Sequence, residues 1–349
     1  MLAAKAQRTR QSNWAKRVSF VLIFFAIIFF ALFLALFFVS YANGLPFLEI
    51  LAYFFTSSFF SISGLLNVLV KTTPLLIATL GTLIAFKCRI WNIGAEGQMA
   101  LGVMMTLWAS LFFDIPGILR IILAFVLSFL AGALWAALAG GFKAKWNVPE
   151  IPITLMQNFV ALAVLNFLIS GPWMPGDMPG YARTPALSEE VRFPFLAFPL
   201  NTTFLVSLVL VPIVYFLMYR SSLGYKLRAT GESPKAANYS GMNSKKLIVI
   251  TMFISGGLCA LAGTTVVVGE YFFCVKGITG NLGFYAIVCA LIARMRPELT
   301  PFTSFFVAAV IVGASALSIK GVPGQFVHLA VGILFIASLL ETLYERRKA

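Results

Sequence analysis

Three polar side chains stand close together between long apolar stretches of this chain: Asn92, Glu96 and Gln98. Carboxylate and amide groups of this kind bind solutes, and they also tie helices to one another. A carboxylate in lipid costs at least about 2.5 kcal/mol, so it faces a bundle interior or a water-filled path. The spacing therefore predicts either a solute contact or a buried structural tie. Gly94 and Gly97 would permit the helix break that a structural tie requires.

The sequence offers little for catalysis or metal binding. It has one histidine, His328, and its four cysteines show no metal-ligand spacing. A phosphate-binding loop, a dinucleotide fingerprint, a zinc-protease motif and a nucleophile elbow are all absent from the sequence. We therefore expect a non-catalytic chain with no metal and no cofactor, which cannot hydrolyse ATP by itself.

The composition is that of a membrane protein. Of the 349 residues, 60% are apolar and 11% are charged, whereas a soluble domain has about 25% charged residues. The mean hydropathy is +0.94. The fold class is therefore predicted to be an all-α polytopic membrane protein. The net charge of +14 needs no nucleic acid to explain it, because basic residues mark the cytoplasmic side and attract anionic membrane lipids.

The apolar runs predict about ten transmembrane helices, since about 20 apolar residues cross the hydrocarbon core. The eighth run is too short to cross alone, and we expect a half-helix completed by residues 276–283. The predicted spans are approximately 18–41, 64–86, 93–113, 117–142, 149–171, 199–219, 247–268, 284–293, 300–318 and 325–343.

The basic residues predict the orientation. Most of the 26 Lys and Arg residues fall on one side if both termini are cytoplasmic. The organisation is then a basic cytoplasmic N-terminus (1–17) and a transmembrane domain (18–345), with an outer loop at 172–198 and a cytoplasmic loop at 220–246. The chain divides near Phe198 into five spans that start inside and five that start outside. This topology predicts an inverted 5+5 repeat, although the halves show no sequence match.

Two local patterns predict finer structure. In the cytoplasmic loop, Ser233 is a helix N-cap, Pro234 suits the first helical position, and Gly241 suits a left-handed terminator. A helix this short needs a partner to dock against. Within the membrane, small residues recur every four positions, which lets helices approach closely. These rows are Gly132, Ala136 and Gly140, and Ser255, Cys259 and Gly263.

Residues 91–98, Trp-Asn-Ile-Gly-Ala-Glu-Gly-Gln, resemble the Asn-Ile-Gly-x-Glu-Gly-Gln signature of ABC-importer permeases. The family is that of the branched-chain amino acid, ribose and nucleoside permeases, in the branch paired with basic-membrane-protein lipoproteins. Further segments match in family order, and the resemblance covers about residues 65–345. These segments are 71–76 (Lys-Thr-Thr-Pro-Leu-Leu), 224–231, 236–242 and 255–263.

The resemblance implies a permease subunit in the bacterial cytoplasmic (inner) membrane that imports solute by alternating access. Its implied partners are ATP-binding-cassette ATPase subunits carrying ATP and Mg, a second permease subunit in a homo- or heterodimer, and a solute-binding lipoprotein. The residues implied to couple to the ATPase are Ser233, Pro234, Ala236, Ala237, Asn238, Tyr239 and Gly241. The candidates for the solute pathway are Asn92, Glu96, Gln98, Asn158, Phe284 and Tyr285.

The solute stays open among a nucleoside, riboflavin and a simple sugar, with a nucleoside favoured. The chain departs from the family pattern in the segment 148–154 that enters the fifth span, at Tyr285, where family members have an acid, and at Arg296. These departures fall near the implied pathway. A secondary transporter with its own ion site is a further alternative, but only Glu96, Glu150 and Glu270 lie near membrane depth. If Glu96 is structural, the sequence suggests that Glu96→Gln is tolerated.

Overall fold

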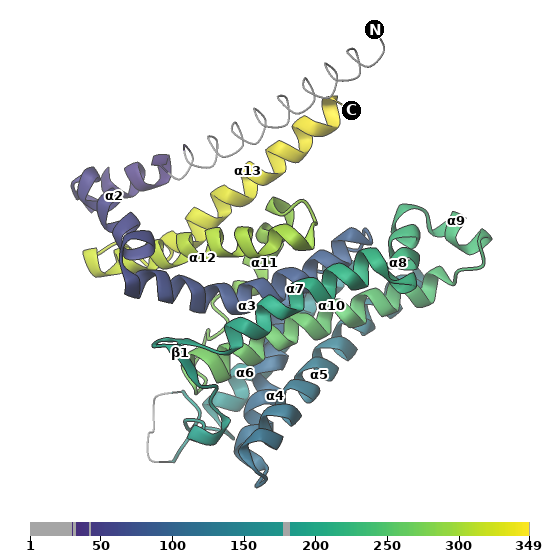
Figure 1. Cartoon of the computed structure of the whole chain (residues 1–349), viewed down its shortest axis with the longest axis horizontal. Helices are drawn as coiled ribbons and strands as arrows, with labels where there is room; N and C mark the ends of the chain where they lie inside the picture. The colour runs from purple at the N-terminus through teal and green to yellow at the C-terminus, as the bar shows by residue number, and fades with distance from the viewer. Residues whose placement is uncertain (1–29, 31–32, 42, 177–181, 349) are drawn as a thin grey trace. The chain divides into compact units, whose positions relative to one another are not determined.

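The computed structural model of the chain is almost entirely helical (Figure 1). It describes residues 30, 33–41, 43–176 and 182–348, with side chains described as far as 338. The chain forms two compact units. Residues 62–309 form the first, called here the 62–309 unit. The residues before it and those from 310 onward form the second, the terminal unit.

The 62–309 unit carries most of the long helices. They are α3 (Ile62–Lys87), α4 (Ala95–Phe112), α5 (Gly117–Trp146), α6 (Glu150–Ser170), α7 (Thr203–Arg220), α8 (Ser222–Glu232), α9 (Pro234–Tyr239), α10 (Ser244–Val266) and α11 (Leu282–Ile292). Short elements join them: the 3-10 turns η2 (Glu189–Val191) and η4 (Pro297–Leu299), the π-helical turn η3 (Val267–Tyr271), and the strands β1 (Phe195–Ala197) and β2 (Leu200–Asn201).

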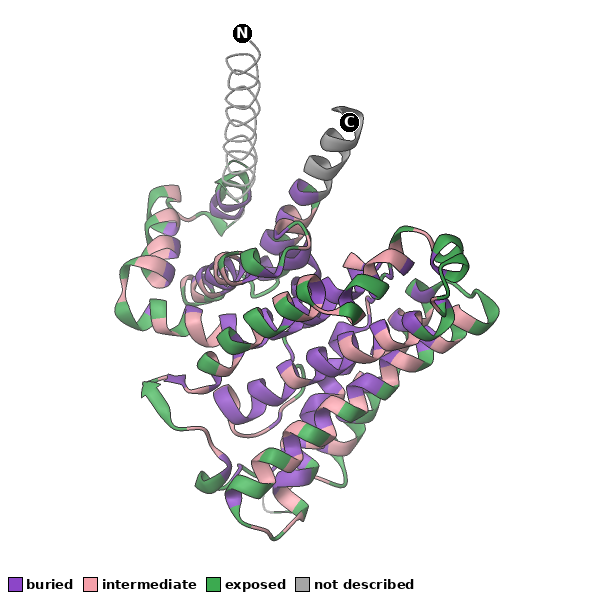
Figure 2. Cartoon of the chain, turned by 45° about the vertical axis from the view of Figure 1, so that its right-hand side comes forward, coloured by how far each residue is buried: buried purple, intermediate pink, exposed green. Residues whose placement is uncertain are grey.

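The helices α3, α4 and α10 are the most deeply buried of the long helices in this unit, whose buried residues are purple in Figure 2. Helix α10 packs against α3, α4 and α5. Within the most apolar 18-residue stretch of each helix, 83% of the α3 residues are buried, compared with 28% in α5 and 22% in α7. Since the hydrocarbon core is itself apolar, helices with exposed apolar faces are suited to lipid rather than to water.

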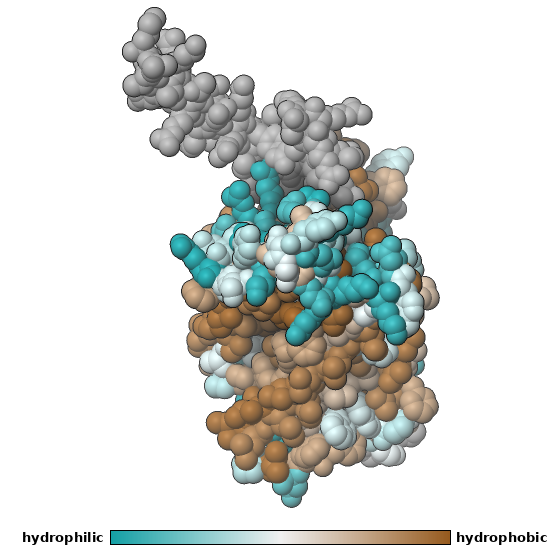
Figure 3. Space-filling view, turned by 90° about the vertical axis from the view of Figure 1, so that its right-hand side faces the viewer, coloured by the Kyte–Doolittle hydropathy of each residue, from teal (hydrophilic) through white to brown (hydrophobic). Residues whose placement is uncertain are grey.

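The outer face of α5 shows this pattern clearly. Every fourth residue is a large exposed hydrophobic side chain, namely Ile118, Ile122, Val126, Leu130, Leu134, Leu138 and Phe142. Residues four apart are neighbours on a helix surface, so these side chains form a continuous apolar row that winds slowly around α5. In Figure 3 a wide apolar band lies below the hydrophilic side chains that gather over α8 and α9. This band is the surface expected to meet lipid.

The predicted row of small residues on α5 packs against Gly256 and Ala260 of α10, whereas the predicted row on α10 faces α3 and α4, where a Cβ added to Gly81 would lie 2.8 Å from Cys259 Sγ and one added to Gly263 would lie 2.0 Å from the Met99 carbonyl oxygen. A Cβ atom added to Gly132 would lie 2.3 Å from Ala260 Cβ and 2.5 Å from the Gly256 carbonyl oxygen. A Cβ added to Gly256 would lie 2.3 Å from Ala136 Cβ. The two backbones approach so closely that these positions admit no side chain.

Six described helices are long and apolar enough to cross a membrane: Ile62–Lys87, Gly117–Trp146, Glu150–Ser170, Thr203–Arg220, Ser244–Tyr271 and Pro297–Lys320. They coincide with six predicted spans, so the polytopic helical class is confirmed. Helix α4 occupies the predicted span 93–113, and α11 is as short as expected for the eighth span. Of the first predicted span, residues 33–41 are helical, while 18–29, 31 and 32 lie outside the described residues.

The sequence-based prediction was incomplete in two places. The predicted outer loop ends in a small antiparallel hairpin that extends into the predicted span 199–219 and pairs Phe195 with Asn201. It also lies along the chain after α10, because Thr184 N–H donates to the Cys274 carbonyl at 3.0 Å and Leu187 N–H donates to the Phe272 carbonyl at 2.7 Å. The prediction also missed the helical segment at 47–60.

The terminal unit contains that missed segment. Its elements are α2 (Phe47–Phe55), the π-helical η1 (Thr56–Phe60), the 3-10 turn η5 (Leu317–Lys320) and α13 (Phe326–Lys348). The boundary with the other unit falls within α12 (Thr300–Ala316). Lys320 forms an ion pair with Glu49 at 2.7 Å. A Cβ added to Gly313 would lie 2.8 Å from the ring of Phe54, so these segments pack closely.

The α5–α10 contact makes a prediction about stability. Gly132→Ala should lower the stability of the purified protein by about 1–3 kcal/mol, because an added methyl group has no room. Gly141→Ala on the same helix is the matched control, since a Cβ there meets nothing within 4 Å. Thermal unfolding in detergent measures both. A Gly132→Ala variant as stable as the control would contradict the close packing.

Candidate functional site

The polar segment of the sequence forms the connection between α3 and α4. Asn92 organises it from both ends of its side-chain amide. The Oδ1 atom accepts the Gly94 N–H at 3.0 Å and the Gln98 Nε2 at 3.0 Å. The Nδ2 atom donates to Gln98 Oε1 at 3.0 Å and to Ser255 Oγ, on α10, at 2.8 Å. Asn92 thereby holds the start of α4 against α10.

Asn158, on α6, completes the start of α4. Its Oδ1 atom accepts the Gly97 N–H at 2.8 Å, and its Nδ2 atom donates to the Ile93 carbonyl at 2.9 Å. The first N–H groups of a helix have no partner within the helix, and Asn158 supplies one from a neighbouring helix. A Cβ added to Gly97 would lie 2.8 Å from Asn158 Cα. The lack of a side chain at Gly97 therefore lets α4 approach α6 closely, and it does not break the helix.

Glu96 reaches in the other direction, to the start of α11. Its Oε2 atom accepts the Gly283 N–H at 2.8 Å, and its Oε1 atom accepts the Asn281 N–H at 3.2 Å. The Thr279 side chain also hydrogen-bonds to it. A Cβ added to Gly283 would lie 2.3 Å from the Glu96 backbone nitrogen. Glu96 thus caps α11 across a contact between two backbones.

This arrangement suits a carboxylate electrostatically. The N-terminus of a helix carries a partial positive charge and favours a negative group, by about 0.3–1 kcal/mol and more where it is partly buried. Asn281, the N-cap residue of α11, has φ 61° and makes no capping hydrogen bond with its own side chain. Glu96 supplies the missing cap from another helix.

Four predicted pathway candidates therefore form one network. Asn92, Glu96, Gln98 and Asn158 are each 2% exposed or less. Their side-chain groups make hydrogen bonds to one another, to Ser255, or to the backbone at helix starts. Buried polar groups require such partners, and here the partners belong to the protein itself. The geometry is that of a structural tie among α4, α6, α10 and α11.

The other two candidates lie on α11 beside Gly283. Tyr285 is 6% exposed, and Phe284 is half-buried. The structure therefore places all six candidates near the starts of α4 and α11, and it shows hydrogen bonds for Asn92, Glu96, Gln98 and Asn158 there.

A second carboxylate holds the same connection from the side. Glu150, at the start of α6, accepts the Trp91 N–H at 3.0 Å and pairs with Lys143 of α5 at 2.5 Å. Cys88, at the beginning of the connection, is buried, and its burial raises the pKa of its thiol to about 12. Burial likewise raises the pKa of the Cys274 thiol to about 12. Both thiols are therefore protonated and unreactive at neutral pH.

The predicted short cytoplasmic helix is present as α9. Ser233 Oγ accepts the Ala236 N–H at 3.3 Å, and Pro234 occupies the first turn. Gly241 ends the segment with φ +79°, and the Met242 N–H donates to the Ala237 carbonyl at 2.9 Å. Both the cap and the terminator are those expected from the sequence.

The preceding helix, α8, rests on the connection between α3 and α4. A Cβ added to Gly231 would lie 2.6–2.8 Å from the backbone atoms of Cys88. Next to this contact, Arg89 and Glu232 form an exposed ion pair at 2.7 Å. Helix α8 thus touches the same connection that carries Asn92.

The sequence matches a family model described as "Branched-chain amino acid transport system / permease component" over residues 64–339. The chain belongs to this permease family. It is 31% identical over 278 residues to a guanosine ABC transporter permease protein of Bacillus subtilis, covering 77% of this chain and 79% of that protein. It is 29% identical over 318 residues to a glucose ABC transporter permease protein of Haloferax volcanii, covering 87% and 81%.

A nucleoside ABC transporter permease protein of Lactococcus lactis is 25% identical over 291 residues, covering 79% of this chain and 80% of that protein. The chain is therefore the permease subunit of an ABC transporter and a multi-pass membrane protein. Permease subunits of this family are not catalytic. In the part of the permease that the structure describes, no group of three or more His, Cys, Asp or Glu residues could hold a metal ion.

Several functional residues escaped the sequence analysis. Thr279 and Asn281, which contact Glu96, lie in a segment expected to complete a half-helix, and Ser255 was noted only for its small size. A sequence signal existed for Asn281, because asparagine before an apolar run is a typical helix start. No local signal links it to Glu96, which lies 185 residues earlier.

The geometry revises the expected effect of Glu96→Gln. Both carboxylate oxygens accept backbone N–H groups, so the amide of glutamine would turn an NH₂ group toward one of these donors. We expect Glu96→Gln to lose about 1–3 kcal/mol of stability, and Glu96→Leu to lose more. Glu298→Gln, at an exposed glutamate, is the matched control.

Thermal unfolding of the assembled transporter, together with uptake per folded complex, measures this effect. A Glu96→Gln variant of normal stability with abolished uptake would contradict the structural tie and indicate a solute contact.

Proposed function

We propose that this permease moves a nucleoside from an extracytoplasmic binding lipoprotein into the cytoplasm, as part of an ATP-driven importer in the bacterial inner membrane. The observation that carries the proposal is the family match combined with similarity to guanosine and nucleoside permeases. ATP and Mg belong to separate ATPase subunits, and a second permease subunit, identical or related, completes the path. This chain itself holds no cofactor.

Riboflavin or a simple sugar is the alternative solute. One relative is a glucose permease protein, and another, 26% identical over 302 residues, is a probable riboflavin import permease protein of Treponema pallidum. Guanosine, glucose and riboflavin all carry a polyhydroxylated part. This shared chemistry supports a path that recognises hydroxyl groups, whichever of the three solutes it carries.

The proposed topology places both termini in the cytoplasm, with ten spans in an inverted 5+5 arrangement and a transmembrane domain over residues 18–345. The basic segment 1–17 lies before it. Six long apolar helices among the described residues support a multi-pass fold. Hydrophilic side chains gather over α8 and α9 (Figure 3), which supports a cytoplasmic position for residues 220–246 under the positive-inside rule.

The ATPase is proposed to dock on α9. Tyr239 is 93% exposed and stands at the end of the helix, as a residue available to a partner should. Ala237 is only 3% exposed, so it packs within the permease and is better placed to hold α9 than to contact the ATPase. Ser233, Pro234, Asn238 and Gly241 shape the helix ends. The Ala236 N–H donates to the Oγ atom of the N-cap residue Ser233.

Motion of α9 has a physical route into the membrane. Helix α8 rests on Cys88 through Gly231, and the connection beyond Cys88 is fixed by Asn92 to α10. Glu96 then joins α4 to α11. Packed contacts and hydrogen bonds of this kind can carry a displacement when the elements they join have two arrangements. We infer that this network transmits the movement of α9 to the membrane helices and does not contact solute.

The outer loop is proposed to help dock the lipoprotein. Its buried residues Leu187 and Val191 anchor it, while Glu189 and Glu190 are exposed. The Arg192 guanidinium donates to the Leu187 carbonyl at 2.8 Å and is thus used within the loop. The exposed pair of acids suits a basic, salt-sensitive partner surface. Asp177 lies outside the described residues.

Uptake by vesicles that contain this permease, its ATPase and its lipoprotein tests the proposed solute. Uptake of labelled guanosine should require ATP and the lipoprotein, and other nucleosides should compete with it. Excess glucose should not compete. Uptake of glucose or riboflavin in place of guanosine would contradict the nucleoside proposal but not the permease role.

The docking of α9 makes a separate prediction. Tyr239→Ala should lower solute-stimulated ATPase activity several-fold, because aromatic anchors at interfaces contribute about 2 kcal/mol or more. Membrane insertion and expression should not change, since the side chain is exposed. Tyr41→Ala, at a tyrosine that is 82% exposed and remote in sequence from α9, is the control. Equal stimulation in both variants would remove α9 from the coupling role.

A further inference from the structure

An ion pair outside the signature network joins α3 to the π-helical turn η3. Lys71 Nζ donates to Glu270 Oε1 and also to the Tyr271 hydroxyl at 3.1 Å. The Tyr271 ring lies 5.1 Å from the ammonium group. Single π-helical turns of this kind occur often at functional sites. The structural tie described above makes no use of these residues.

The depth of this pair is unusual for charged groups. Lys71 lies about 24 Å along α3 from Lys87, at 1.5 Å per residue. In the proposed orientation this places it near the outer boundary of the hydrocarbon core, which is about 30 Å thick. The Lys71 and Glu270 side chains are 25% and 14% exposed. Charged groups at such depth face an aqueous path or a protein partner rather than lipid.

The pair leaves hydrogen-bonding groups unused. Glu270 Oε2 is buried and has no hydrogen-bond partner among the described residues. Lys71 can donate three hydrogen bonds, and two are made to Glu270 and Tyr271. A free acceptor therefore stands beside a free donor. A hydroxyl group both donates and accepts hydrogen bonds, so a single hydroxyl can pair with Glu270 Oε2 and with the remaining N–H of Lys71 at the same time.

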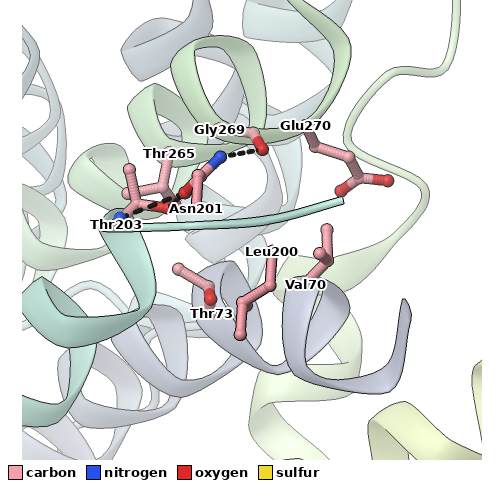
Figure 4. A pocket seen from close by; sticks show the side chains of 8 residues that line it. All are labelled: Val70, Thr73, Leu200, Asn201, Thr203, Thr265, Gly269 and Glu270. Carbon is pink, nitrogen blue, oxygen red and sulfur yellow. Dashed lines mark hydrogen bonds between the residues drawn. The ribbon is translucent and has the colours of Figure 1, made fainter. Parts of the chain in front are cut away.

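Glu270 also forms one wall of a pocket that is rich in hydroxyl and amide groups (Figure 4). Across it lie Thr73 of α3, Thr265 of α10 and the pair Asn201 and Thr203, while Val70 and Leu200 supply an apolar side. Asn201 donates to the Gly269 carbonyl. The pocket has no space for a water molecule in this conformation, so the site is closed here.

We propose that Lys71 and Glu270 form the outer solute contact of this permease, where they bind the hydroxyl groups of a neutral polyhydroxylated solute when the pocket opens. This inference rests on the proposed import of a nucleoside or sugar and names the residues that recognise its sugar part. Glu270 Oε2 accepts one hydroxyl, and the free N–H of Lys71 donates to the same or an adjacent one. The apolar side formed by Val70 and Leu200 accommodates the solute's less polar surface.

Uptake selectivity tests the site. The measured quantity is the ratio of kcat/KM for guanosine to that for 2′,3′-dideoxyguanosine, in vesicles with one and the same lipoprotein and ATPase. Lys71→Met combined with Glu270→Met removes both charges together, so neither is left buried without its partner. We expect this double variant to lower the ratio about tenfold, as the loss of hydrogen bonds to charged groups would.

Two further variants complete the test. Glu270→Gln keeps the shape and should lower the ratio by a smaller factor. Arg89→Gln combined with Glu232→Gln removes the exposed cytoplasmic pair and should leave the ratio unchanged. If the double variant leaves the ratio at the wild-type value, whether or not uptake of both solutes falls, the proposal that Lys71 and Glu270 contact the solute is wrong. Failure of every Glu270 variant to assemble would assign the residue to the fold and would also overturn the proposal.

The outcomes separate this inference from the proposed function. If wild-type vesicles import glucose and no guanosine, the nucleoside proposal fails. The same variants are then compared with glucose and 2-deoxyglucose. A lowered ratio there would support the hydroxyl contact, and an unchanged ratio would overturn it.

Discussion

The hydrocarbon core of a membrane offers no hydrogen bonds, so every break in a helix must be satisfied by the protein itself. This permease has such breaks before α4 and before α11. Asn92 and Asn158 satisfy the first, and Glu96 satisfies the second. Asn158 and Glu96 each act from a helix other than the one they cap, and Asn92 acts from the connection just before α4. The polar groups at the centre of an apolar chain are therefore what allows its helices to end inside the bundle.

The packing follows from these ties. A carboxylate can reach the amide of Gly283 only where two backbones nearly touch, and α4 and α11 do so because position 283 has no side chain. Small residues let α5 approach α10 in the same way. In the described conformation the buried polar side chains at this centre are hydrogen-bonded to the protein itself. We infer that the solute path runs past other polar groups, among them the partly exposed ion pair of Lys71 and Glu270.

Local signals in the sequence predicted local structure well. The Ser233 cap and the Gly241 terminator act over a few residues, and both were found as expected. Apolar runs predicted six helices that the structure shows to be long enough to cross. Partners remote in sequence were not predictable. Nothing near Glu96 indicates that it binds an amide 185 residues away. The hairpin that pairs Phe195 with Asn201 depends on the anchoring of its loop against residues 268–275, and the sequence carries no period-2 pattern there long enough to show it.

The Glu96 carboxylate is occupied by the backbone of α11, and we infer that it is not available to solute. Hydrogen exchange of the amides in residues 279–284, in the assembled transporter with and without solute, measures this directly. The account predicts slow exchange at Asn281 and Gly283, at the same rate in both conditions. Fast exchange at these two amides, or protection that appears only with solute, would contradict it.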